Sequence, residues 1–156
     1  DADYTRDVLA ELGNVAFWKV AMRPGRPFAF GPLNGADGKR SWLFGLPGNP
    51  VAALVTFYVL AREALLHLAG AAPQPLPLLR VRSAVAIRKR PGRTEYQRGI
   101  VSRADDGAWQ VQLTGSQGAG VLRSMSEANA LVVLGHEQGS VAAGDGVDVM
   151  LFDGLA

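Results

Sequence analysis

The pattern of hydrophobic and polar positions divides the chain into two parts of different texture. Up to about residue 75, helical spacing alternates with strand formers, which predicts helices at 4–12 and 50–69 and strands at 15–22 and 41–44, the last one short and buried. Asn49 as N-cap and Pro50 at the first helical position mark the start of the second helix, and Gly70 marks its end. Two strands are too few to stand alone, so this part is expected to belong to a larger α/β layer.

The second part shows short stretches with a period of two. Between residues 79 and 88, the large aliphatic residues keep to odd positions and the arginines to even ones, as in a strand with one buried face. Further strands are predicted at 96–103, 109–114, 130–134 and 147–152. This number of short strands favours a small barrel or sandwich. A proline-rich stretch at 70–77 separates the parts, so we expect an α/β portion at 1–75 and an all-β domain, a barrel or a sandwich, at 76–156.

Composition excludes several classes of protein. Hydrophobic residues make up 48% of the 156 residues, which excludes a disordered chain. The absence of cysteine excludes disulfides, a thiol nucleophile and thiolate-bound metal, and His67 and His136 are too few for a histidine-rich zinc site. The net charge is only +2 despite a pI of 9.3, a field too small to indicate a polyanionic partner by itself.

Targeting signals and membrane spans are not expected. The longest apolar run covers only residues 51–61, whereas a membrane-spanning helix needs about 20 residues. No apolar segment follows the polar start of the chain, so no signal peptide is predicted, and a cytoplasmic location is expected. There is also no initiator methionine, which suggests a fragment or a processed piece of a longer chain.

Two loops are candidates for binding an anion. The sequence Gly-Leu-Pro-Gly-Asn-Pro at 45–50 leads from a strand into a helix N-terminus, where unpaired N–H groups and the helix dipole favour negative charge. The turn Arg-Pro-Gly-Arg-Pro at 23–27 follows the other strand, so both loops are expected at one edge of a parallel sheet, with Lys19, Arg23 and Arg26 as cations. A purely structural strand-to-helix turn and a solvated basic turn remain open alternatives.

Other charged segments are ambiguous. Asp3, with Asp1 and Asp7 nearby, suits either a magnesium site or a helix cap. Residues 80–103 hold eight basic residues and one acid, Glu95, which fits either a nucleic-acid-binding barrel or the solvated face of an alternating strand. Tyr96 is the one aromatic residue in that stretch, fewer than stacking on bases usually needs.

Several motifs together resemble one known family. They are Ala-Asp-Tyr-Thr at 2–5, the segments 17–27 and 45–51, and Pro-Gly-Arg-Thr-Glu-Tyr-Gln-Arg-Gly at 91–99, followed by the segments 114–118 and 124–129. In this order they resemble the molybdopterin molybdotransferases, the MoeA and gephyrin E-domain family. The resemblance implies part of a three-layer molybdopterin-binding α/β domain, followed by a small β-barrel.

The resemblance also implies a reaction. The family inserts molybdate into adenylylated molybdopterin, uses Mg²⁺ and releases AMP. It implies a homodimer formed through the full-length chain and molybdopterin adenylyltransferase as a partner, with no membrane and no nucleic acid. These 156 residues are expected to be weak or inactive alone, because the family's chain is longer. A non-catalytic interaction module and, less favoured, a nucleic-acid-binding barrel remain as alternatives.

The resemblance also implies functions for individual residues. Arg23 and Arg26 replace the two lysines of the family's Lys-Pro-Gly-Lys-Pro, so the charge is kept while a compact ammonium becomes a planar fork. The implied catalytic residues are Asp3, Lys19 and Arg23, with Asp3 also the metal ligand, and the implied binding residues are Arg26, Gly45, Pro47, Gly48, Asn49, Pro50, Arg98 and Ser124.

Overall fold

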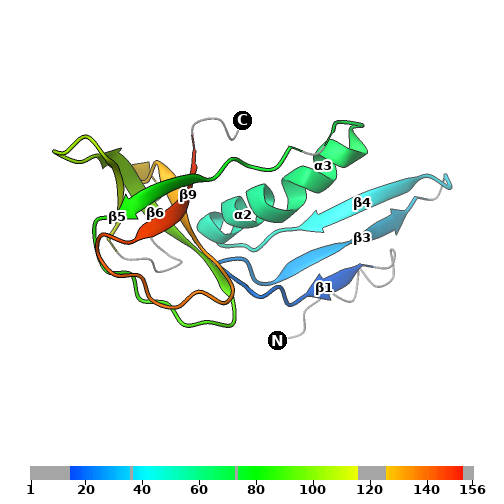
Figure 1. Ribbon diagram of the computed structural model, residues 1–156. Coiled ribbons are helices and arrows are strands. Elements are labelled where there is room, and N and C mark those ends of the chain that lie inside the picture. The colour runs from blue at the N-terminus through cyan, green and yellow to red at the C-terminus, as the bar shows by residue number, and fades with distance from the viewer. Residues whose placement is uncertain (1–14, 36, 73, 116–125, 153–156) are drawn as a thin grey trace.

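The computed structural model describes residues 15–35, 37–72, 74–115 and 126–152, which form a sheet with one long helix and a β-barrel (Figure 1). The sheet contains β1 (Ala16–Trp18), β3 (Phe28–Asn34) and β4 (Arg40–Gly45), in the order β1-β3-β4. Both pairings are antiparallel, whereas the sequence predicted a parallel sheet. The predicted helix at 4–12 lies outside the described residues.

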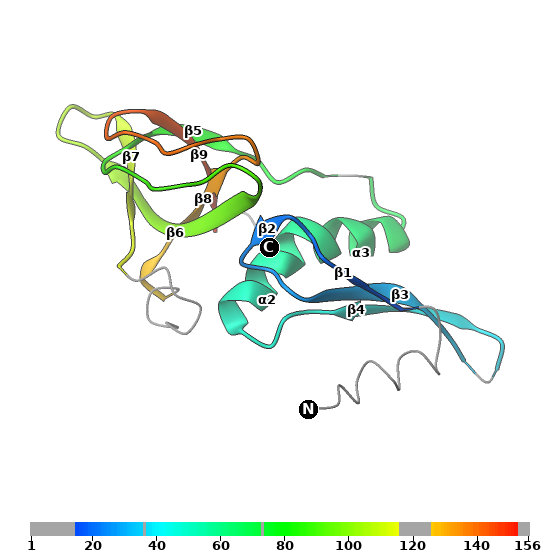
Figure 2. The same cartoon turned by 90° about the horizontal axis from the view of Figure 1, so that it is seen from below.

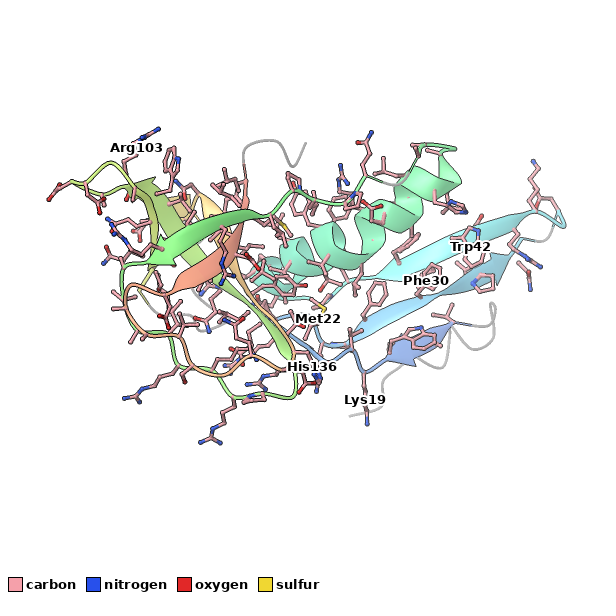
Figure 3. The ribbon with its side chains drawn as sticks, in the orientation of Figure 1. Lys19, Met22, Phe30, Trp42, Arg103 and His136 are labelled. Atoms are coloured by element: carbon pink, nitrogen blue, oxygen red, sulfur yellow. The ribbon has the colours of Figure 1, made fainter. Side chains whose placement is uncertain are left out.

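Strand β3 was not predicted from the sequence because Gly31 and Pro32 interrupt its run of strand formers. Proline cannot donate to a β ladder, yet Pro32 is tolerated here because β1 pairs only as far as Phe30. The strand predicted at 41–44 is present but not buried: Ser41 and Trp42 are exposed among the described residues. Stacked aromatic rings of Phe30 and Trp42, 5.4 Å apart, line one face of this sheet (Figure 3).

A continuous helix runs beside the sheet (Figure 2). It consists of α2 (Pro50–Thr56), the π-helical segment η1 (Phe57–Ala61) and α3 (Arg62–Leu68). The predicted start is confirmed, since Pro50 occupies the first turn behind Asn49. By length and composition alone this one helix is long and apolar enough to cross a membrane, which is weak support for a span because core helices pass the same test. The absence of a membrane-spanning segment therefore stays a prediction.

Five strands close into a barrel, one of the two architectures that the alternating pattern favoured and the one that the family resemblance implied. They are β5 (Leu79–Ser83), β6 (Thr94–Arg103), β7 (Trp109–Leu113), β8 (Ala130–Leu134) and β9 (Gly146–Leu151). The order β6-β7-β5-β9-β8 closes because β8 also pairs with β6. Strand β5 is shorter than predicted, because the chain bends after Ser83, whose hydroxyl donates to the carbonyl of Val85. Buried aliphatic side chains, such as Val111, Val132 and Leu134, fill the interior.

The two parts are joined by a short strand and a shared core. The strand predicted at 15–22 is broken: β1 ends at Trp18, and β2 (Met22–Arg23) pairs in parallel with β6 of the barrel. Met22 of β2 and Val55 of the helix pack against Leu131 and Met150 of the barrel. Figure 3 shows Met22 between the two parts. We call these four residues the seam core. Burying them fixes the position of β2 relative to the barrel.

Candidate functional site

The turn at residues 23–27 packs against the helix in a way that only glycine permits. Gly25 has a φ of 137°, and an added Cβ would lie 2.8 Å from Met22 Cε and 3.1 Å from Thr56 Oγ1. Arg26 Nε donates to the carbonyl of Val20 at 2.8 Å, which closes the turn back onto the preceding segment. These contacts therefore fix the backbone of the turn at Arg23 and Arg26.

The two candidate loops leave the sheet at the same edge. At that edge Trp18 at the end of β1 is opposite Phe28, and Gly45 at the end of β4 is opposite Ala29. Strand β3 runs against both neighbours, so β1 and β4 point the same way. The prediction of a shared edge is confirmed, although the reason is an intervening antiparallel strand.

The loop at 45–50 caps the helix. Asn49 Oδ1 accepts a hydrogen bond from the backbone N–H of Ala52 at 3.1 Å, and Pro50 follows at the first helical position. Pro47 is buried and anchors the loop against the rest of the fold. The N–H of Ala53 donates to the carbonyl of Asn49 at 2.8 Å, which continues the helix from the cap.

The two glycines of this loop differ in their surroundings. A Cβ at Gly45 would lie 2.9 Å from Cβ of Ala29, so packing across the sheet already accounts for this glycine. A Cβ at Gly48 would meet nothing within 4 Å, and the residue is exposed. Space for a ligand is therefore present at Gly48 and not at Gly45.

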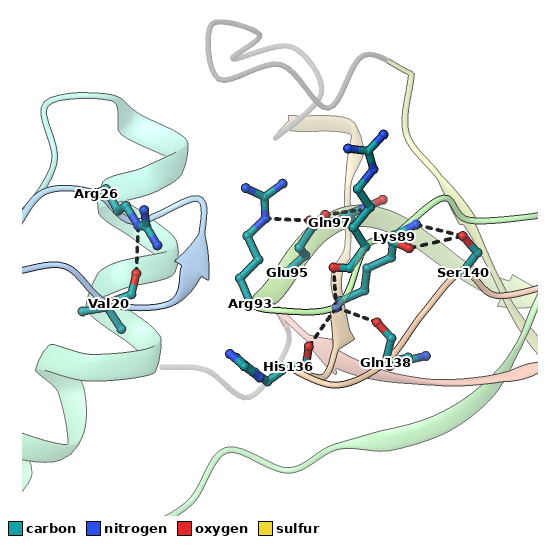
Figure 4. A network of polar contacts seen from close by, with 10 residues as sticks. Val20, Arg26, Lys89, Arg93, Glu95, Gln97, His136, Gln138 and Ser140 are labelled. Carbon is teal, nitrogen blue, oxygen red and sulfur yellow. Dashed lines mark hydrogen bonds and ion pairs between the residues drawn. The ribbon is translucent and has the colours of Figure 1, made fainter.

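Arg23 lies in a cationic cavity formed with the barrel. The cavity, of about 570 Å³, is called the basic pocket and is lined by Arg23, Arg88, Lys89, Arg90, Arg93, Glu95 and Ser140. The parallel pairing of β2 with β6 places Arg23 opposite Glu95 and so brings the turn to the barrel. Figure 4 shows two residues of the barrel wall, Arg93 and Glu95, in contact. Five cations and one carboxylate give this cavity a strongly positive potential.

The carboxylate of Glu95 is held by its neighbours. Its Oε1 accepts from Arg93 Nε at 2.9 Å, and its Oε2 accepts from Gln97 Nε2 at 3.1 Å. Burial alone would raise the pKa of Glu95, but these hydrogen bonds and the charges of Arg93 and Arg23 outweigh burial and lower the pKa below its usual value. Glu95 is therefore ionised at neutral pH and fixes one end of Arg93.

The other predicted site residues are not gathered in this cavity. Lys19 is exposed and projects from the surface in Figure 3, and Arg26 is likewise exposed; neither lines the basic pocket. Arg98 has 2% of its surface exposed, and burial lowers the pKa of its guanidinium. Asp3 and Ser124 lie outside the described residues, so the structure does not place them.

The basic stretch at 80–103 is not one continuous face. Arg82 forms an ion pair with Asp106 at 2.8 Å, and Arg103 lies over the ring of Trp109 at 4.6 Å. Arg80 likewise forms an ion pair, with Asp148. These contacts occupy arginines outside the basic pocket, so the stretch divides into separate surfaces.

Comparisons with known proteins match both parts of the chain. The family model described as "Probable molybdopterin binding domain" matches residues 1–67, and the one described as "MoeA C-terminal region (domain IV)" matches residues 80–152. A molybdopterin molybdenumtransferase of Haemophilus influenzae is 39% identical over 156 residues, covering 99% of this chain and 37% of the relative. The chain belongs to the MoeA and gephyrin E-domain family.

Further members of the MoeA family agree with this assignment. Molybdopterin molybdenumtransferase 1 of Mycobacterium tuberculosis is 39% identical over 153 residues, covering 95% of this chain and 35% of that protein. A solved molybdopterin biosynthesis MoeA protein of Pyrococcus horikoshii shares the fold, with a TM-score of 0.69 and 28% identity, over 98% of this chain and 36% of that one. The chain thus spans about a third of the length of the curated relatives it matches.

Some residues of the site were not assigned from the sequence. Arg88, Lys89, Arg90 and Arg93 stood out only as members of a basic stretch, and nothing in the sequence connected them with Arg23. The connection comes from the pairing of β2 with β6, whose sequences lie far apart. In this member of the MoeA family, the cationic site therefore includes a barrel loop as well as the turn at 23–27.

Proposed function

We propose that the chain carries part of the catalytic site of a molybdopterin molybdotransferase. The reaction is insertion of molybdate into adenylylated molybdopterin, with cleavage of the phosphoanhydride by water and release of AMP. The single observation that carries the proposal is the basic pocket, where a turn that matches the family's motif meets the barrel. Membership of the MoeA family supports the choice of substrates.

The charges of the site suit these substrates. Molybdate and the diphosphate link of adenylylated molybdopterin are both anions, and guanidinium groups bind tetrahedral oxyanions through paired N–H donors. Arg23 contributes a guanidinium from the sheet edge, and Gly48 leaves open space where the loop enters the helix. In this proposal these groups bind and orient the anions and stabilise the charge that develops as AMP leaves.

The proposed magnesium ion needs a separate test. Across residues 15–35, 37–72, 74–115 and 126–152, no three histidine, aspartate or glutamate side chains lie close enough together to hold a metal ion. The described residues thus supply no cluster of three such groups, and no step is derived through the ion. Asp3 remains the proposed ligand.

The assembly and location belong to the same proposal. A homodimer, contact with molybdopterin adenylyltransferase and a cytoplasmic location go with a molybdotransferase of this family. Exposed apolar side chains on the sheet and helix, such as Trp18 at 55% and Leu68 at 50%, leave area for contact with other protein surface.

The test is release of AMP from adenylylated molybdopterin by purified protein at the full length of its gene. With molybdate present, the wild type is expected to release AMP, and Arg23→Gln is expected to lower kcat/KM by about 10- to 100-fold through loss of a charged hydrogen-bond donor. Arg80→Gln is the matched control, because its partner Asp148 lies outside the pocket. Wild-type protein that binds partners but releases no AMP would instead favour a non-catalytic interaction module.

A further inference from the structure

A buried lysine forms part of the wall of the basic pocket. Lys89 is 6% exposed, although lysine side chains normally reach the solvent. Its Nζ donates to the carbonyls of Gln138 at 2.8 Å, Arg90 at 3.2 Å and His136 at 3.4 Å (Figure 4). An ammonium has three N–H donors, so these carbonyls occupy all of them. Lys89 therefore keeps no donor for a bound molecule.

The three carbonyls belong to two loops that lie far apart in the sequence. Arg90 is in the loop between β5 and β6, whereas His136 and Gln138 are in the loop between β8 and β9. The second loop is closed by its own turn, in which the N–H of Gln138 donates to the carbonyl of Gly135 at 3.1 Å. The ammonium of Lys89 therefore joins the two loops, and we call this contact the lysine link.

Other hydrogen bonds join the same loops next to the lysine link. Ile87 and Val141 exchange two backbone hydrogen bonds, each of 2.9 Å. The Oγ of Ser140 accepts from the backbone N–H of Lys89 at 3.2 Å and donates to the carbonyl of Lys89 at 3.3 Å. Lys89 thus contacts the β8–β9 loop through both its backbone and its side chain.

Burial alternates along the β5–β6 loop. Ile87 and Lys89 are buried, whereas Arg88 and Arg90 are exposed and line the basic pocket. An aliphatic side chain at position 89 would fill the same space, but it would remove the donor from the carbonyl of Gln138. The lysine link therefore does more than fill the interior, because it holds the loop that carries the two arginines.

We propose that Lys89 is a positioning residue for the molybdotransferase reaction. By joining the β5–β6 loop to the β8–β9 loop, it sets where the barrel wall stands relative to the turn at 23–27. The role rests on the proposed function for the reaction itself. Lys89 acts through the wall and not on the substrate, because its three donors are occupied. Such positioning affects the rate more than substrate binding, since small misplacements of reacting groups strongly lower a rate.

Steady-state release of AMP by the purified full-length protein tests this role. Lys89→Met fills the same space without donors, so it is expected to lower kcat by about 10-fold and to change KM for molybdate by less than about threefold. Arg88→Gln removes one charge from the same wall and keeps the lysine link, so it is expected to raise KM at nearly unchanged kcat. That second pattern in Lys89→Met would mean that only its charge matters, and would overturn the positioning role.

A matched control separates positioning from loss of stability. Ser83 is fully buried at the end of β5, and its hydroxyl donates to the carbonyl of Val85 at 2.7 Å, but it does not line the basic pocket. Ser83→Ala is expected to lower the stability measured by urea unfolding, as Lys89→Met does, and to leave kcat within about twofold of the wild type. Equal losses of kcat in the two variants would overturn the positioning role.

Amide hydrogen exchange tests the lysine link without any need for activity. The N–H groups of Gly92 and Gln138 donate to carbonyls of the β8–β9 loop, and the N–H of Val101 is bonded elsewhere in the barrel. Lys89→Met is expected to speed exchange at the two loop amides by at least about 10-fold more than at Val101. If the wild type releases no AMP while the loop amides respond in this way, the lysine link is upheld and the proposed function is wrong. If the wild type releases AMP while all three amides respond equally, the proposed function stands and the positioning role is wrong.

Discussion

Among the described residues that line the basic pocket, Glu95 carries the one negative charge, and its surroundings stabilise that charge. Because the pKa of Glu95 is lowered in the folded protein, its stabilising effect is present above the ordinary carboxyl pKa of about 4.3 and is lost as the pH falls through the folded value. The carboxylate thus contributes to the stability of the fold at neutral pH as well as to the orientation of Arg93.

The stability of Glu95→Gln should depend on pH accordingly. At pH 7 we expect the free energy of unfolding to fall by about 1–3 kcal/mol, because the charged hydrogen bond to Arg93 is lost. As the pH falls below the ordinary carboxyl pKa of about 4.3 and through the lowered folded value, the difference from wild type should shrink, because the wild-type carboxylate becomes protonated as well. Urea unfolding at both pH values measures this, with Asp105→Asn, a change at an exposed carboxylate of a barrel turn, as the control. An equal loss at both pH values would contradict the assignment of the lowered pKa.

A second prediction concerns Gly25, whose lack of a side chain lets the arginine turn pack on the helix. Gly25→Ala should destabilise the protein by about 2–4 kcal/mol, because it combines a backbone conformation that alanine avoids with overlap on Met22 and Thr56. Gly107→Ala is the matched control: its φ is 80°, but a Cβ there meets nothing within 4 Å, so only a backbone cost of about 1 kcal/mol is expected. Chemical denaturation compares the two, and equal losses would mean that the packing contact has no effect.

At the scale of elements, the start of the long helix combines a cap with a candidate anion site. Asn49→Ala should lower the free energy of unfolding by about 1 kcal/mol, because the N–H of Ala52 loses its acceptor. Asn49→Asp keeps an acceptor oxygen, so it should retain most of the stability while its added negative charge weakens molybdate binding. Thermal unfolding and molybdate titration of the two variants check this pair of effects. Unchanged molybdate binding in Asn49→Asp would place the anion away from this loop.

The elements differ in how far the sequence predicts them. The barrel strands follow from alternation, because each buries one face in a closed interior, and the helix start follows from Asn49 and Pro50. Strand β3 does not, because Pro32 opposes a central strand unless one knows that β1 ends before it. The break between β1 and β2 also depends on tertiary structure, since both segments are rich in strand formers and separate only to join different sheets.

At the scale of the whole molecule, the basic pocket depends on a contact between distant segments. The pairing of strand β2 with strand β6, which places Arg23 opposite Glu95, determines which arginines of the basic stretch share a cavity with the turn. A sequence shows the charges of Arg80, Arg90 and Arg93 equally, and it cannot show that Arg80 is paired elsewhere while the other two line the cavity. Local spacing in the sequence thus predicts the candidate loops. The pairing of β2 with β6 in the folded protein determines which barrel residues line the cavity with them.

The seam core predicts that the two parts unfold together. Val55 is fully buried against Met22 and the barrel residues Leu131 and Met150, so Val55→Ala removes contacts from both parts at once. We expect a loss of about 1–3 kcal/mol and a single unfolding transition at a lower temperature. The reason is that β2 cannot keep its pairing with the barrel once the helix leaves the seam.

Tryptophan fluorescence measures this cooperativity, because Trp18 and Trp42 lie on the sheet and Trp109 lies on the barrel. In a Trp109→Phe background the signal reports the sheet alone, while circular dichroism reports strands and helix together. Leu134→Ala, a deletion inside the barrel, is the control: it should lower the temperature of the sheet signal too, since the barrel supports β2. Two separate transitions, with the sheet unaffected by Leu134→Ala, would show that the seam does not couple the parts and that the basic pocket opens without global unfolding.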